Sequence, residues 1–202
     1  MQTTFRIIEL IADSIFIGFS LSVIFNLIVS YFLKSEKHKS LFYNYRSYAI
    51  YTVRFLSLAY VLFYSIRFIY FISTNDFYIH NERATGPYAF SYWFILLRPV
   101  LYCGLLQLFW IKPFRKKKLY VLVLATITLV LSFLSATVIE KIIIYVSALH
   151  RDYLPSDWEM QLDSQPILLL YLYHIFEKII LFNIIVGLIW FISSKKWLKI
   201  KL

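Results

Sequence analysis

Cysteine is almost absent from this chain of 202 residues, since Cys103 is the only one. A single thiol excludes an intramolecular disulfide and a metal site made of cysteines. Charge is also scarce: charged residues make up 16% of the sequence, whereas a soluble domain has about 25%. The sequence shows no glycine-rich phosphate loop and no Ser/His/Asp signature. It therefore lacks the common marks of disulfide-stabilised, nucleotide-binding and hydrolytic proteins.

Apolar and aromatic residues dominate instead. The chain is 60% hydrophobic and 20% aromatic, with a mean hydropathy of +0.68. Five apolar stretches are each long enough to cross a hydrocarbon core, which takes about 20 helical residues. The expected helices cover residues 5–33, 48–72, 92–111, 119–149 and 167–193. We therefore expect an all-α, multi-pass membrane protein with one helical domain over residues 1–202, as a four-helix bundle plus one helix.

The basic residues predict the orientation of these helices. They occur in short runs: Lys34, Lys37, Lys39 and Arg46; Arg115, Lys116, Lys117 and Lys118; and Lys195, Lys196, Lys199 and Lys201. By the positive-inside rule these segments face the cytoplasm, so the N-terminus and the loops 73–91 and 150–165 face the periplasm of a bacterial inner membrane. The net charge of +10 then reflects topology and contact with anionic lipids, and we expect no nucleic-acid binding.

Ionisable residues also lie inside the apolar stretches, mostly in their outer halves. They are the acids Glu9, Asp13, Glu140 and Glu177, the bases Arg67, Arg98, Lys141 and Lys178, and His174. A charge at the bilayer centre costs at least ~2.5–3.5 kcal/mol, so such groups pair, line a cavity or take part in function. Two interpretations stay open: interhelical ion pairs that fix the helices, or a polar pocket for a quinone headgroup or a proton path. Arg98 has a further candidate role, because Pro99 frees a backbone carbonyl that the guanidinium can bond.

The histidines do not predict a metal or haem site. A bis-histidine haem needs two imidazoles that face each other within the bundle, and His174 is the only histidine inside an expected helix. We therefore expect no metal site and no directly bound cofactor. A quinone is the candidate ligand.

Two segments resemble a known family of membrane subunits. Residues 81–93 read Asn-Glu-Arg-Ala-Thr-Gly-Pro-Tyr-Ala-Phe-Ser-Tyr-Trp and are similar to an outer loop of the NrfD-like, polysulfide-reductase subunits. Glu140-Lys141, followed after eight residues by His-Arg-Asp-Tyr-Leu-Pro-Ser-Asp-Trp at 150–158, resembles that family's Glu-Arg pair and His-Arg-Asp-Phe-Leu-Pro-Ser-Ser-Trp segment. The likeness is strongest to the quinol-oxidising membrane subunits of alternative complex III. It is specific over residues 73–158 and covers about the C-terminal half of a family member.

The resemblance implies a subunit that exchanges electrons between quinol and an iron–sulfur protein docked on the periplasmic side. The implied docking residues are Arg83, Gly86, Pro87, Tyr88, Trp93, His150, Arg151, Asp152 and Trp158. The quinone and proton candidates are Glu140, Lys141, Arg67, Arg98, His174, Glu177 and Lys178. The alternative for the loop residues is that they hold the two loops to each other.

Three functions follow from these observations. The first is an NrfD-like subunit of a respiratory-type complex, joined by other membrane subunits or a second helical bundle. Such a chain is not catalytic alone but is a candidate part of a quinol-linked oxidoreductase. The second is a non-catalytic scaffold of a membrane assembly. The third is an ion or proton conductor, although the almost wholly apolar residues 119–133 offer no relay.

Overall fold

The structure is a computed structural model that describes residues 2–33, 35–73, 84–85, 89–134, 138–139, 142–143 and 167–194. Over these residues it is helical and contains no strand. The helices are α1 (Gln2–Phe32), α2 (Glu36–Ser73), α4 (Ala89–Gln107), the 3₁₀ helix η1 (Leu108–Trp110), α5 (Lys112–Lys116), α6 (Lys118–Phe133) and α8 (Ile167–Ser194). The predicted all-α class is therefore confirmed.

Four helical segments within the described ranges are long and apolar enough to cross a membrane. They are Ile7–Phe32, Glu36–Tyr70, Ala89–Trp110 and Leu172–Ser193. The described part of α6 is apolar but shorter, at 16 residues. The four longer segments thus have the length and composition of membrane spans.

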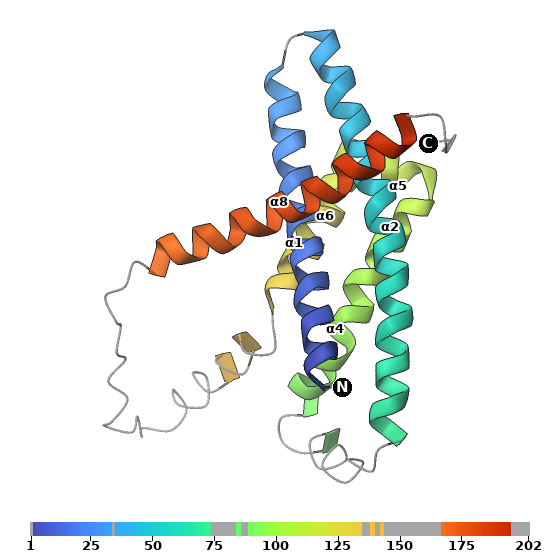
Figure 1. Ribbon diagram of the computed structural model, residues 1–202, viewed down its shortest axis with the longest axis vertical. Helices are drawn as coiled ribbons and strands as arrows, with labels where there is room; N and C mark the ends of the chain where they lie inside the picture. The colour runs from blue at the N-terminus through green and yellow to red at the C-terminus, as the bar shows by residue number, and fades with distance from the viewer. Residues whose placement is uncertain are drawn as a thin grey trace.

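Helix α1 is the central element of the fold. It packs against α2, α6 and α8, while α4 contacts α2 and α6. Helices α1, α2, α4 and α6 run roughly along one direction, whereas α8 crosses α1 obliquely and its first half extends away from the other helices (Figure 1). Most of the surface of α8 is therefore left outside the bundle.

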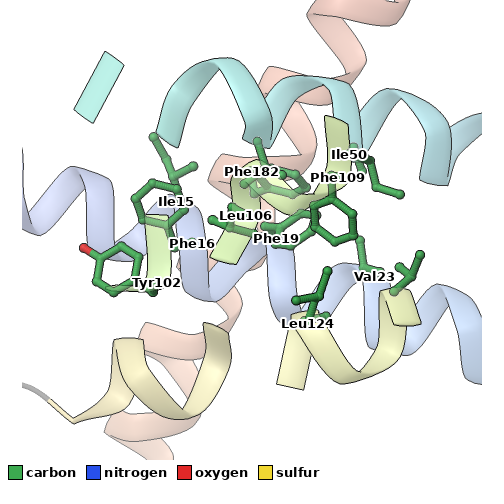
Figure 2. Close-up of a cluster of buried hydrophobic side chains, with 14 of the residues drawn as sticks. Ile15, Phe16, Phe19, Val23, Ile50, Tyr102, Leu106, Phe109, Leu124 and Phe182 are labelled. Carbon is green, nitrogen blue, oxygen red and sulfur yellow. The ribbon is translucent and has the colours of Figure 1, made fainter. Parts of the chain in front are cut away.

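Aromatic side chains fill the core where α1 meets α4 and α8. The Phe19 ring lies edge-on to Phe109 at 6.1 Å and to Phe182 at 5.7 Å between centroids (Figure 2). The ring centroids of Phe16 and Tyr102 are 5.1 Å apart. Edge-to-face aromatic pairs contribute about 0.5–1.5 kcal/mol each beyond the area they bury. Helix α1 therefore joins the bundle to α8 through a continuous aromatic core.

Two predicted helix boundaries are wrong. Helix α2 begins at Glu36 rather than at residue 48, so most of the first basic run is helical and not a loop. Residues 36–47 contain no proline or glycine, and Lys39 pairs with Glu36 one turn earlier, which favours helix. The predicted continuous helix 119–149 is interrupted, because α6 ends at Phe133 and Leu134 has a non-helical ψ of 61°.

The prolines act differently from each other. The third span ends near the predicted residue 111, because α4 and η1 together run to Trp110 and Ile111 is extended. Pro113 then lies in the first turn of α5, where its missing N–H leaves no hydrogen bond unmade. Pro99 lies inside α4, which continues past it.

Candidate functional site

A buried ion pair connects α1 to α4. The Arg98 guanidinium donates through Nη2 to Asp13 Oδ2 at 3.1 Å, and the Tyr102 hydroxyl donates to Asp13 Oδ1 at 3.0 Å. Arg98 and Tyr102 are one turn apart on α4, so both reach the same carboxylate. Arg98 is only 8% exposed. Both oxygens of Asp13 are thus occupied by donors from the neighbouring helix.

The same arginine also bonds the C-terminal end of α6. Its Nη1 donates to the carbonyl of Leu134 at 2.9 Å and to that of Ser132 at 3.5 Å. The last carbonyls of a helix have no partner within the helix, so a nearby cation stabilises them. In the sequence analysis, the candidate partner of Arg98 was the backbone carbonyl that Pro99 leaves without an N–H donor. The carbonyls that Arg98 bonds are those of Ser132 in the last turn of α6 and of Leu134 directly after it.

A second ion pair joins α1 to α2. Arg67 contacts the Glu9 carboxylate through Nη1, and about a third of each side chain is exposed. Glu9 lies one turn before Asp13 on α1. Together the two pairs connect α1 to α2 and α4 near the same end of the bundle. The outer polar layer predicted from the sequence is therefore assembled, at least in these four residues, as interhelical pairs.

A polar cluster that the sequence did not predict surrounds Arg54 on α2. The Arg54 guanidinium lies over the Trp110 ring at 4.1 Å and donates to the Phe109 carbonyl at 3.4 Å. Gln107 donates to Ser57 Oγ at 2.6 Å and accepts from Trp110 Nε1 at 2.7 Å. This cluster ties α2 to the irregular η1 segment. The sequence signal for this cluster was the group of Gln107, Phe109 and Trp110 directly before the turn at Ile111.

The polar residues of α8 lie apart from these clusters. His174 Nδ1 is 3.3 Å from Glu177 Oε2, but the two side chains are 55% and 62% exposed. The predicted convergence of His174 and Glu177 with the layer around Asp13 is therefore not seen. Lys178 is half-buried where α8 meets α1, with its carbonyl close to Gly18.

Further along, α8 is held by hydrogen bonds. Tyr45 donates to Asn183 Oδ1 at 2.5 Å, and Asn183 Nδ2 donates to Ser22 Oγ at 3.0 Å. The Tyr48 and Ser193 hydroxyls are 3.2 Å apart. Asn183 thus bonds residues of both α1 and α2, which fixes the second half of α8 on the bundle.

Beside these hydrogen bonds lies a cavity of 720 Å³ between α1, α2 and α8. Its walls include Phe25, Phe42, Phe176 and Trp190, and most of its lining is apolar. The volume falls in the range of about 300–1,000 Å³ that is usual for ligand pockets. It faces the half of α1 that is distant from Asp13, and not the polar layer, for which a pocket was one of the two interpretations left open by the sequence.

Many predicted site residues lie outside the described part of the chain. They are the quinone and proton candidates Glu140 and Lys141, and the docking residues Arg83, Gly86, Pro87, Tyr88, His150, Arg151, Asp152 and Trp158. The described member of the docking set, Trp93, donates from Nε1 to the Ala84 carbonyl at 3.2 Å. This bond connects the start of α4 to the loop before it.

The described ranges contain no group of three or more His, Cys, Asp or Glu side chains that could hold a metal ion. Cys103 is buried and free.

Comparison with protein-family models, with curated proteins and with solved structures found no match to this chain. Apart from the exposed His174–Glu177 pair, the polar side chains described above join neighbouring elements, and the cavity beside α8 has a size and lining suited to an apolar molecule.

Proposed function

We propose that this chain is a non-catalytic subunit of a larger membrane assembly, in which its helical bundle holds a partner through α8. The observation that carries the proposal is the exposed His174–Glu177 pair on the part of α8 that extends away from the bundle, in a helix that is mostly apolar. A carboxylate that faces lipid is costly, and donors from a neighbouring chain would lower that cost. In the bundle, by contrast, Asp13 and Glu9 already have partners.

The pairing inside the bundle favours a scaffold over a conductor. Asp13 accepts two hydrogen bonds from α4, and Arg98 donates to the end of α6. Proton or ion transfer needs groups that change partners along a hydrated route. The residues Leu119 to Phe133 are nearly all apolar, which gives no such route through α6. The partner we favour is a membrane subunit of a respiratory-type complex, in keeping with the NrfD-like loop segments.

The orientation belongs to the same proposal. Five spans place the N-terminus and the loops 73–91 and 150–165 outside and the basic runs in the cytoplasm. The fifth span requires that α6 resume beyond Leu134, which would bring it to membrane-spanning length. Lys37 and Lys39 in the first turn of α2 and Lys118 at the start of α6 lie at the same end of the bundle, which supports this orientation.

Purification from native membranes in a mild detergent tests the subunit proposal. We expect a second polypeptide to accompany the wild-type chain in a fixed ratio, identified by mass spectrometry. Changing both His174→Leu and Glu177→Leu should reduce the retained partner roughly tenfold, which corresponds to about 1.4 kcal/mol. Leu62→Ala with Ile66→Ala, a pair of exposed α2 positions, serves as the control and should retain the partner.

Two results would contradict the proposal: a wild-type chain that purifies alone, or a double α8 variant that keeps its partner in full. Solvent extraction of the same preparation adds a second readout. A quinone retained by the wild-type chain would give the 720 Å³ cavity an occupant and favour the quinol-linked form of the complex.

A further inference from the structure

A polar recess lies at the basic end of the bundle, on a different face of α2 from the large apolar cavity. It has a volume of 320 Å³ and is formed where α1 ends and where α2 and α6 begin. Its lining residues are Ser30, Glu36, Lys39, Ser40, Tyr43, Arg46 and Lys118. Three cationic side chains against one carboxylate leave the lining with a net charge of +2. The recess is therefore suited to an anion.

Arg46 is the most restrained of the three cations. It is 5% exposed, and its guanidinium lies over the Tyr43 ring at 5.3 Å. Among the described residues it forms no salt bridge. A guanidinium presents a planar set of donors that matches two oxygens of a phosphate. A buried arginine beside a polar recess is thus arranged to bind a phosphate ester.

The other two cations add charge from two helices. Lys39 Nζ lies 2.8 Å from Glu36, so part of its charge is already compensated. Lys118 is the first residue of α6, whose N-terminus has no side-chain cap. The uncapped N–H groups of a first helical turn favour negative charge. The positive field at the recess therefore comes from side chains and from the α6 backbone.

The surroundings favour a phosphate that is carried by a lipid. Tyr31 and Phe32 directly follow Ser30 and are 83% and 75% exposed, while Leu119 follows Lys118 and is also exposed. Aromatic residues at this position typically lie at the headgroup level of a bilayer. Basic pockets between helices on the cytoplasmic side bind the headgroups of anionic lipids. A free phosphate would gain nothing from this apolar rim.

We propose that the recess around Arg46 and Lys118 binds the headgroup phosphate of an anionic phospholipid, with the acyl chains against the exposed apolar rim. The site is independent of the α8 surface, and its binding does not need the partner proposed above. It would hold one specific lipid at the basic end of the bundle. The lipid phosphate would also give the buried Arg46 guanidinium a counter-charge.

Lipid titration of the full chain in detergent tests this site. Native mass spectrometry would count the bound molecules of phosphatidylglycerol and of phosphatidylcholine with the same acyl chains. We expect phosphatidylglycerol to bind at least about fivefold more tightly, since each basic residue near an anionic surface contributes ~1 kcal/mol. Inorganic phosphate at millimolar concentration should not displace the lipid.

Charge-removing variants locate the effect. Lys118→Ala and Arg46→Ala should each lower phosphatidylglycerol binding about fivefold, and Arg46→Lys should recover part of it. Lys37→Ala removes the same charge from the exposed start of α2 outside the recess and should bind as wild type does. Lys118 is exposed, so its variant reports binding even if loss of Arg46 prevents folding. Equal binding of both lipids, a Lys118→Ala variant no weaker than Lys37→Ala, or displacement by phosphate would overturn the proposal.

Discussion

Arg98 shows how one buried charge stabilises several helices at once. Its guanidinium donates to a carboxylate on α1 and to backbone carbonyls at the end of α6, while its own backbone belongs to α4. Removing one partner of a buried pair leaves the other charge without compensation, which costs more than replacing both. The pair with Asp13 therefore specifies how α1, α4 and α6 fit together.

A double-mutant cycle tests this role. Asp13→Asn keeps the size of the side chain but leaves Arg98 unpaired. We expect it to lower the free energy of unfolding by roughly 2 to 3 kcal/mol, near the low end for buried pairs because Asp13 is 22% exposed. Adding Arg98→Met should then cost less than Arg98→Met costs in the wild-type chain, because the ion pair is already lost. Denaturant unfolding in detergent, followed by tryptophan fluorescence, measures both.

The control for this cycle is Glu36→Gln, which removes an ion pair at the exposed start of α2 and should leave the unfolding midpoint unchanged. An Asp13→Asn variant as stable as wild type would contradict the role assigned to Arg98. So would additivity, in which the double variant loses as much stability as the two single variants lose together.

The sequence was sufficient to place Asp13, Glu9, Arg67 and Arg98 in one polar layer, because depth follows from counting residues along an apolar helix. It could not give their partners. A partner depends on the rotation of each helix about its axis, which tertiary packing decides. The interruption of α6 at Leu134, which supplies carbonyls to Arg98, was likewise hidden in an apolar stretch.

Among the helices, α8 depends on a close approach to α1. A Cβ atom on Gly18 would lie 2.2 Å from the Lys178 carbonyl oxygen and 2.8 Å from Phe182 Cβ. Ser22, one turn later, accepts a hydrogen bond from Asn183 of α8. Small residues four apart allow two membrane helices to pack with their backbones close together. The Gly18 and Ser22 spacing was the sequence signal for this contact.

Gly18→Ala should force α8 away from α1. We expect a loss of about 1–3 kcal/mol in stability, as for other substitutions that overfill a packed interface. Gly187→Ala is the matched control on α8, because a Cβ there meets no atom within 4 Å. It should be neutral or stabilising. Thermal unfolding in detergent compares the two, and equal midpoints would show that α8 does not rest on Gly18.

For the whole molecule, charge distribution and helix arrangement agree. The starts of α2 and α6 bring Lys37, Lys39, Arg46 and Lys118 to one end, and the Glu9–Arg67 and Asp13–Arg98 pairs lie toward the other. The alternation of basic runs predicted this separation of charge. The oblique path of α8 was not predictable, because its apolar residues surround the helix and indicate no preferred face.

We propose that these helices cross a bilayer with their basic end in the cytoplasm. Cys103 is fully buried, so a cysteine introduced at the surface can be labelled selectively. Two variants, Lys37→Cys at the basic end and Ser73→Cys at the end of α2, would be expressed in bacteria and treated as spheroplasts with a membrane-impermeant maleimide. We predict that Ser73→Cys reacts at once, whereas Lys37→Cys reacts only after permeabilisation. Labelling of Lys37→Cys in intact spheroplasts would place the basic end outside the cell and contradict this orientation.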